Sequence, residues 1–205
     1  MSVIAFILLL IYSIALLYIT VYCLLQFHLL IFYKRHHWSK QEKHLAMAEM
    51  SDQLPFVTIQ LPIFNEMYVV ERLLDNITQF KYPKERYEIQ VLDDSTDATI
   101  DISRRKIESY KAKGYNIELY HRTERSGYKA GALKEAMPHA KGQFIAIFDA
   151  DFLPNPDFLL TTIPHFIHPE VGVVQTRWEH INENYSMLTR LQAMQLNVHF
   201  TVDLP

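Results

Sequence analysis

The first 33 residues are almost entirely apolar, which sets them apart from the rest of the chain. The run from Ile4 to Leu25 is nearly unbroken, and it continues to Tyr33 with only Gln26 and His28 as interruptions. A helix of this length can cross a bilayer. A secretory signal peptide would need a basic start, a shorter apolar core and a small-residue cleavage site, none of which is evident. We therefore predict one transmembrane helix within residues 1–33.

Basic residues follow this apolar run closely, and none precedes it. They are Lys34, Arg35, Lys40 and Lys43. Because basic residues stay on the cytoplasmic side, this asymmetry predicts an outside N-terminus and a cytoplasmic location for the remaining chain. On this topology the two glycosylation sequons, at Asn76 and Asn184, would stay unmodified. Residues 34–54 are polar and are interpreted as a short amphipathic connector near the membrane surface.

From Pro55 onward, short apolar runs alternate with segments of helical periodicity. The predicted strands are Phe56–Leu61, Tyr87–Leu92, Asn116–Tyr120, Phe144–Phe148 and Val171–Gln175. The predicted helices are Val69–Phe80, Ala98–Lys113, Lys129–His139, Asp157–Phe166 and Asn184–Asp203, with Ser95 or Thr96 as cap of the second and Gly114 as its end. This alternation predicts an α/β domain over residues 55–205, with a mostly parallel sheet flanked by helices.

Acidic residues follow three of the predicted strands at their carboxyl ends. Glu66 follows the first strand, Asp94 the second, and Asp149 with Asp151 the fourth. Since parallel strands point the same way, these side chains should meet at one edge of the sheet, where open α/β sheets bind ligands. Asp149 and Asp151 offer oxygen ligands for Mg²⁺ or Mn²⁺, which can bridge to nucleotide phosphates.

Lys129 could place a cation beside such phosphates, although a solvated lysine at a helix start is an equally good interpretation.

The composition and the missing motifs exclude several other classes of protein. The chain has 205 residues, a formal net charge of -3 and one cysteine, so it is predicted to bind no nucleic acid and to form no disulfide framework. A dinucleotide-binding fold needs a glycine-rich turn after the first strand, but the turn at residues 62–66 contains no glycine. The sequence also has no P-loop, and it has no G-x-S-x-G elbow of a nucleophilic hydrolase.

Five stretches together resemble the family 2 glycosyltransferases, inverting enzymes of the GT-A fold, and most closely the membrane-bound β-glycan synthases of the glucomannan and cellulose type. The stretches are Leu61–Glu66, Val91–Asp97, Arg125–Leu133, Phe148–Asp151 and Val173–Trp178. The resemblance implies that Glu66 and Asp94 contact the uridine of the nucleotide, that Asp93 supports them, and that Lys129 faces the diphosphate.

The resemblance further implies that Asp149 and Asp151 form the D-x-D motif, with Asp151 as direct metal ligand and Asp149 near the sugar nucleotide. Gln175 and Thr176 would border the acceptor path. The expected cofactor is Mg²⁺ or Mn²⁺, and the expected partners are a UDP- or GDP-linked hexose, a glycan or lipid acceptor, and the membrane.

The family carries its catalytic base in a Thr-Glu-Asp motif downstream of the D-x-D strand, followed by a Gln-x-x-Arg-Trp motif. Gln175-Thr-Arg-Trp178 is one residue too short to be the second motif. The base is therefore expected beyond Pro205, and the sequence is interpreted as the donor-binding half of a longer enzyme. The alternative is a non-catalytic nucleotide-sugar-binding or membrane scaffold protein, if the chain is natively this short.

Overall fold

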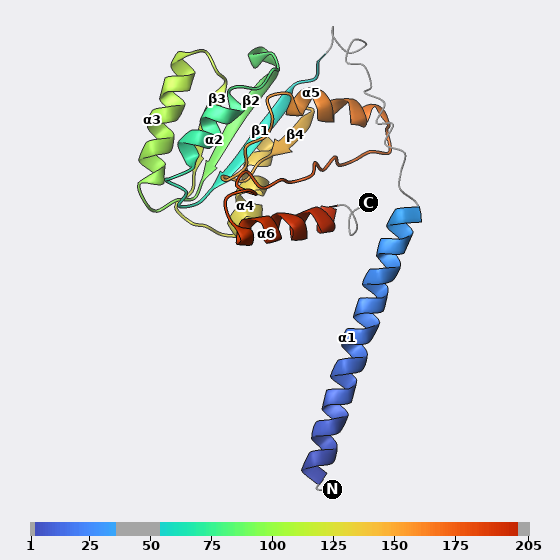
Figure 1. The fold of residues 1–205 in the computed structure, drawn as a ribbon. Helices are drawn as coiled ribbons and strands as arrows, with labels where there is room; N and C mark the ends of the chain where they lie inside the picture. The colour runs from blue at the N-terminus through green and yellow to red at the C-terminus, as the bar shows by residue number, and fades with distance from the viewer. Residues whose placement is uncertain (1–2, 36–53, 201–205) are drawn as a thin grey trace. The chain divides into compact units, whose positions relative to one another are not determined.

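The computed structural model describes residues 3–35 and 54–200. The chain falls into two units, and the α/β body belongs to the unit that ends at Val174. Helix α1 and the segment from Gln175 onward belong to the other unit and are described by themselves. The ribbon in Figure 1 shows a sheet with helices on both of its faces in the α/β body.

The sheet has four parallel strands in the order β3-β2-β1-β4. They are β1 (Val57–Ile63), β2 (Tyr87–Asp93), β3 (Ile117–His121) and β4 (Phe144–Ile147). Every residue of β2 is buried, and so is every residue of β1 except Pro62, which is half-buried. A strand covered on both faces is what a parallel sheet between helices requires. The predicted α/β class is thus confirmed.

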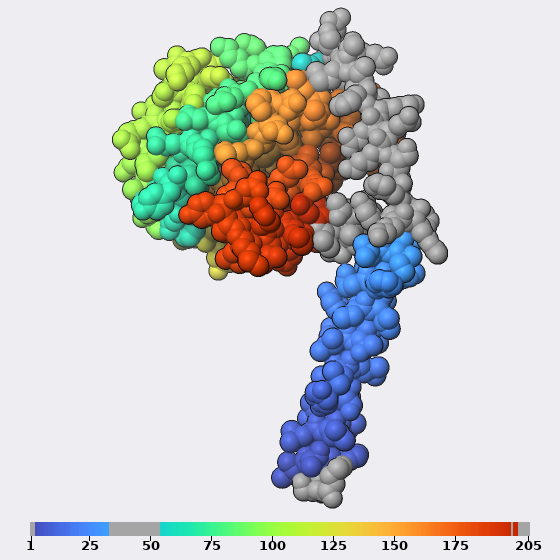
Figure 2. All heavy atoms as spheres, viewed as in Figure 1, coloured from blue at the N-terminus to red at the C-terminus, as the bar shows by residue number. Residues whose placement is uncertain are grey.

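The two faces of the sheet are covered by different helices. The main apolar core joins Ile59, Ile89 and Val91 to α2 (Val70–Ile77), α3 (Thr99–Ala112) and α5 (Phe158–Thr162). A smaller core joins Leu92 to Ala132 and Ala136 of α4 (Tyr128–Ala136), so α4 covers the opposite face. In the space-filling view the residues around α2 and α5 form one continuous surface (Figure 2). Below this surface, Phe80 stacks on Phe158 of α5.

The face under α4 carries buried polar side chains that pair across the strands. Thr58 donates from Oγ1 to Oε1 of Glu88 at 2.8 Å, and Gln60 donates from Nε2 to Oε1 of Gln90 at 2.9 Å. These pairs offset part of the cost of burying polar groups under a helix that contributes small alanines, although Gln60 Oε1 and Gln90 Nε2 have no hydrogen-bond partner among the described residues. The buried residues of β1 and β2 are therefore mainly apolar on one face and partly polar on the face under α4.

The end of α3 follows the prediction, but its start does not. Gly114 takes a left-handed conformation (φ +80°), and its N–H donates to Lys111 O at 2.9 Å. At the start, the predicted caps Ser95 and Thr96 were wrong, because both contact Asn65 of the turn after β1. The Oδ1 atom of Asp97 accepts the Thr99 N–H instead, at 2.9 Å.

The predicted fifth strand was also wrong. Residues 171–175 form no strand, and the Val173 side chain is 83% exposed. An apolar run becomes a strand only if a neighbouring strand completes its hydrogen bonds, and β4 pairs only with β1 among the described residues. Helix α5 is shorter than predicted and continues as a 3₁₀ turn, η4 (Ile163–Ile167), that has Pro164 in its first turn.

Helix α1 (Val3–Arg35) is the predicted apolar helix. Its segment Val3–Phe32 contains an 18-residue window with a mean hydropathy of 2.7 and is long and apolar enough to cross a membrane, a property that signal sequences share. The predicted connector falls mainly on residues 36–53, outside the described residues. Helix α6 (Met187–Val198) lies within the predicted range and starts with a capping box, in which Ser186 and Thr189 bond each other's backbone N–H at 3.1 and 2.9 Å.

Candidate functional site

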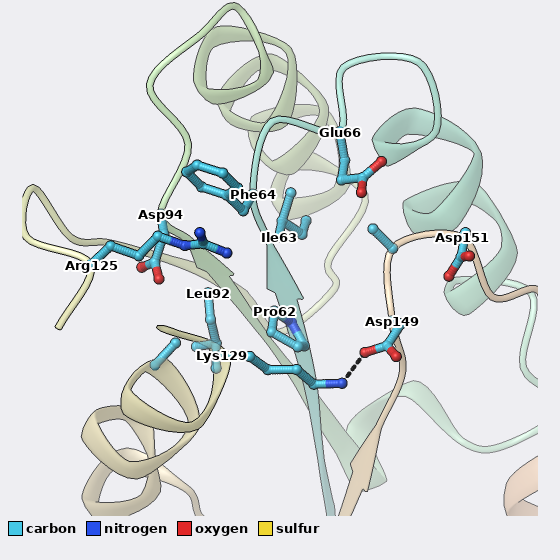
Figure 3. Close-up of a pocket in the computed structure, with 12 residues that line it drawn as sticks. Pro62, Ile63, Phe64, Glu66, Leu92, Asp94, Arg125, Lys129, Asp149 and Asp151 are labelled. Carbon is cyan, nitrogen blue, oxygen red and sulfur yellow. Dashed lines mark hydrogen bonds and ion pairs between the residues drawn. The ribbon is translucent and has the colours of Figure 1, made fainter. Parts of the chain in front are cut away.

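A cleft of about 370 Å³ lies at the carboxyl ends of the strands (Figure 3). Its lining comes from the ends of β1 and β2, from α4 and the turn before it, and from the loop after β4. The lining residues are Pro62, Ile63, Phe64, Glu66, Leu92, Asp94, Arg125, Lys129, Ala132, Asp149, Ala150 and Asp151. Glu66, Asp94, Lys129, Asp149 and Asp151, all predicted from the sequence, thus meet in one cleft.

The turns after β1 and β2 are fastened to each other. Asn65, in a left-handed conformation (φ 55°), donates its N–H to Ser95 Oγ at 2.8 Å. Its Oδ1 accepts the Thr96 N–H at 2.9 Å, and the Asp94 N–H donates to Ile63 O at 3.0 Å. Asparagine tolerates the left-handed region better than most residues do. These bonds hold the turn that carries Glu66 against the turn that carries Asp94.

Asp93 and Asp94 are neighbours with different surroundings. Asp93 is fully buried, and its Oδ1 accepts the Ser95 N–H at 2.8 Å, so its carboxylate shapes the turn and does not line the cleft. Asp94 lines the cleft and receives two bonds from Arg122: Nε to Oδ1 at 2.8 Å, and Nη2 to Oδ2 at 2.5 Å. The bond with Asp94 raises the pKa of the Arg122 guanidinium, against the opposing effect of burial.

Lys129 comes from the first turn of α4 and forms an ion pair with Asp149, which follows β4 (Figure 3). The turn before α4 is tight, because Gly127 is left-handed (φ +71°) and Gly131 approaches Ser126 closely. A Cβ atom on Gly131 would lie only 2.0 Å from Ser126 O. The backbone therefore places Lys129 over the strand ends only if position 131 lacks a side chain.

Asp149 and Asp151 are the residues that could hold a divalent cation. Asp149 is half-buried and Asp151 is exposed, and both line the cleft. The described residues contain no group of three or more His, Cys, Asp or Glu arranged to hold a metal ion. Two carboxylates alone suit Mg²⁺ or Mn²⁺, which commonly complete their coordination with water and substrate phosphates. The donor set therefore fits the predicted cofactor.

Sequence reasoning missed Phe64, Leu92 and Arg125, which also line the cleft. The Cζ atom of Arg125 lies 3.4 Å from the centroid of the Phe64 ring, so the guanidinium stacks on it. All three lie at or near strand ends on the same edge, which is the signal that could have found them. Gln175 and Thr176 belong to the other unit, and their place on an acceptor path stays a prediction.

The parallel sheet and its cleft place the protein in the class of α/β proteins that bind ligands at the carboxyl ends of their strands. The sheet presents carboxylates, a lysine and an arginine at the carboxyl edge of parallel strands, where α/β proteins bind phosphorylated ligands. The sequence model of the family described as "Glycosyl transferase family 2" matches residues 58–202, and the chain belongs to this family. The family resemblance noted from the five stretches is therefore confirmed.

Plant mannosyltransferases are among the relatives of this chain. Glucomannan 4-beta-mannosyltransferase 7 of Arabidopsis thaliana is 42% identical over 177 residues, covering 84% of this chain and 31% of that protein. Glucomannan 4-beta-mannosyltransferase 1 of Oryza sativa subsp. japonica is 45% identical over 154 residues, covering 73% of this chain and 30% of that protein. The chain thus spans somewhat under a third of the length of these curated relatives.

A solved structure supports the fold assignment. A mannosyltransferase from Pyrobaculum calidifontis, in complex with GDP-Man and Mn²⁺, superimposes with a TM-score of 0.54 at 38% sequence identity. The match covers 60% of this chain and 36% of that one. The predicted GT-A fold class is confirmed by this similarity together with the four-stranded parallel sheet.

Proposed function

We propose that this chain contains the donor-binding part of a membrane-anchored inverting glycosyltransferase. The enzyme would transfer a hexose from a nucleoside diphosphate to a glycan or lipid acceptor in a metal-dependent reaction. The observation that carries the proposal is the meeting of Glu66, Asp94, Lys129, Asp149 and Asp151 in one cleft, from segments up to 85 positions apart.

The chemistry follows from the charges in the cleft. Asp149 and Asp151 would hold Mg²⁺ or Mn²⁺, and the bound ion stabilises the charge that develops on the departing nucleoside diphosphate. Lys129 would donate to the diphosphate oxygens, while Asp94 and Glu66 would accept N–H or O–H groups of the nucleoside. Deprotonation of the acceptor hydroxyl needs a base, and we assign that role to none of the residues that line the cleft.

GDP-mannose is the donor that the comparisons favour. The plant relatives are named glucomannan 4-beta-mannosyltransferases, and the Pyrobaculum calidifontis mannosyltransferase was solved with GDP-Man and Mn²⁺. A UDP-linked hexose is the other donor class that the site could take. The nucleotide is identified by comparing GDP with UDP in the same binding experiment.

We further propose that α1 spans the membrane and that the α/β body lies on the cytoplasmic side. The helix has the length and hydropathy that a span requires. The basic residues that closely follow its apolar segment support this orientation.

The test is calorimetry of the full chain in detergent, titrated with GDP in the presence and absence of Mn²⁺. Asp151→Asn should weaken the Mn²⁺-dependent binding at least about tenfold, because the metal loses a charged ligand. Asp157→Asn is the matched control: it removes an exposed acid of the same loop that does not line the cleft. Metal-independent binding, or equal affinities in the two variants, would refute the proposed function.

A further inference from the structure

We propose that Arg122 is a positioning residue, which fixes the Asp94 carboxylate in the direction that nucleoside recognition requires. The inference rests on the proposed function, because it assumes that Asp94 meets the nucleoside. Arg122 follows β3 directly and does not line the main cleft. It lines a second, smaller cavity of about 100 Å³, and Asp94, Leu92 and Ala132 border both spaces.

The contact between Arg122 and Asp94 is bidentate and shielded from water. The Arg122 side chain is 10% exposed and the Asp94 side chain is 5% exposed. Two parallel bonds, at 2.8 and 2.5 Å, fix the plane of the carboxylate as well as its position. Each carboxylate oxygen can accept a second bond, so Asp94 keeps acceptor capacity for a ligand in the cleft.

The guanidinium is itself held from its other side. Nη1 donates to Ser126 O at 3.2 Å, and Nη2 donates to Tyr128 O at 3.1 Å. Ser126 lies in the tight turn before α4 and Tyr128 is the first residue of α4, where Gly131 leaves room for both Ser126 O and Arg122 Nη1. With these four bonds and a fifth, longer one from Nη1 to Glu135 Oε2, Arg122 has little freedom to rotate, and neither has the carboxylate that it holds.

The pairing with Arg122 matters because Asp94 is negatively charged. A nucleoside diphosphate is anionic, and the cleft already contains Glu66, Asp149 and Asp151. A buried carboxylate without a partner would be costly to desolvate and would repel the anionic ligand. Arg122 neutralises the charge while it preserves the acceptors, and it approaches from the smaller cavity, so it takes no space from the ligand.

A purely structural ion pair would give the same contacts, so the test must separate the two roles. The affinity of the full chain in detergent for GDP is measured by calorimetry with saturating Mn²⁺. The proteins are wild type, Arg122→Lys, Asp94→Asn and the double variant. Lysine keeps the charge but cannot supply the planar pair of donors. Each single variant should bind GDP about tenfold more weakly, since hydrogen bonds to charged groups are of that strength.

The double variant should bind no more weakly than the worse single variant, because Arg122 acts through Asp94. Losses that multiply, to about a hundredfold, would show two independent roles and overturn the inference. Inorganic pyrophosphate with Mn²⁺ gives a second reading: its affinity should stay within about twofold in Arg122→Lys, since it has no nucleoside for Asp94 to meet. An equal loss for GDP and pyrophosphate would also overturn it.

Glu135→Gln is the matched control. Glu135 also contacts Arg122, at 3.4 Å, but is 68% exposed, and its removal leaves the bond to Asp94 in place. GDP affinity should stay within about twofold of wild type. If Arg122→Lys does not fold, as judged by its thermal unfolding, Arg122→Gln replaces it in the cycle. If the wild type shows no Mn²⁺-dependent GDP binding, the proposed function is refuted as well. If the wild type binds GDP but the losses of affinity in the two single variants multiply in the double variant, only the role of Arg122 is refuted.

Discussion

At the scale of single residues, the site is characterised by which of its charges are already paired. Asp94 is paired with Arg122, and Asp149 with Lys129. Glu66 and Asp151 make no ion pair within the described residues, although both line the cleft. Both acids therefore keep a charge without a counter-charge among the described residues, which for Asp151 agrees with its proposed place as direct metal ligand.

Lys129→Gln should separate ligand binding from stability. The Lys129–Asp149 pair is about half exposed, at 49% and 39%, and exposed pairs contribute at most about 1 kcal/mol to the free energy of unfolding. The Mn²⁺-dependent affinity for GDP should nevertheless fall about tenfold or more, because a cation beside the diphosphate is lost. Calorimetry and thermal unfolding measure the two effects.

The control for this prediction is Lys134→Gln, which removes an exposed lysine from the same helix outside the cleft. It should leave both the affinity and the stability unchanged. A similar loss of affinity in the two variants would mean that Lys129 acts only through the general charge of α4.

At the scale of elements, side-chain contacts connect α2 to α5 and to α3 on one face of the sheet. Phe80 stacks on Phe158, which joins the end of α2 to α5. Asp75 of α2 joins α3 through an ion pair with Lys106, at 2.8 Å, and a hydrogen bond from the Tyr110 hydroxyl. These contacts hold α2 in place, and α2 follows the turn that carries Glu66.

The contact between α2 and α3 should respond to acid. Burial acts to raise the pKa of Asp75, but the hydrogen bonds from Lys106 and Tyr110 prevail and lower it from its usual 3.8. A lowered pKa contributes stability above pH 3.8, and this stability is lost as the pH falls through the folded-state pKa. Asp75→Asn should therefore lower the unfolding temperature at pH 7, and the difference from wild type should shrink at pH below 3.8.

Thermal unfolding at both pH values checks this prediction. Asp101→Asn is the control, because Asp101 is a 79% exposed acid of α3 paired only loosely with Arg104, at 3.6 Å. It should change the unfolding temperature little at either pH. A difference between Asp75→Asn and wild type that persisted or grew in acid would contradict the assigned role of Asp75.

At the scale of the whole molecule, an α/β body is combined with a long apolar helix. The described part of the body ends its sheet at β4, which pairs only with β1 there. The curated relatives are about three times as long as the matched region. The activity of a whole enzyme, including proton removal from the acceptor, therefore stays a proposal.

The proposed orientation predicts the fate of the sequons at Asn76 and Asn184. If the body is cytoplasmic, neither asparagine is glycosylated when the chain is expressed in eukaryotic cells. Endoglycosidase treatment should then leave the electrophoretic mobility unchanged. A control variant with an added N-terminal tail that carries an Asn-Gly-Thr sequon should be glycosylated. A mobility shift that Asn76→Gln or Asn184→Gln abolishes would reverse the orientation.

The sequence by itself determined the features that depend on neighbouring residues. The length of the apolar run determined α1, and the alternation of apolar strands with amphipathic helices determined the α/β class. It also predicted that Glu66, Asp94 and Asp149 would share one edge, because residues that follow parallel strands must lie at the same end of the sheet.

Only the tertiary structure decided which side chains meet across that edge. The bonds from Arg122 to Asp94 join residues 28 positions apart, and the bond from Asn65 to Ser95 spans 30. Such contacts depend on strand order and register, which no local pattern specifies. The same reason explains why the strand predicted at 171–175 does not form. Its residues suit a strand, but a strand exists only where a neighbouring strand supplies its hydrogen bonds.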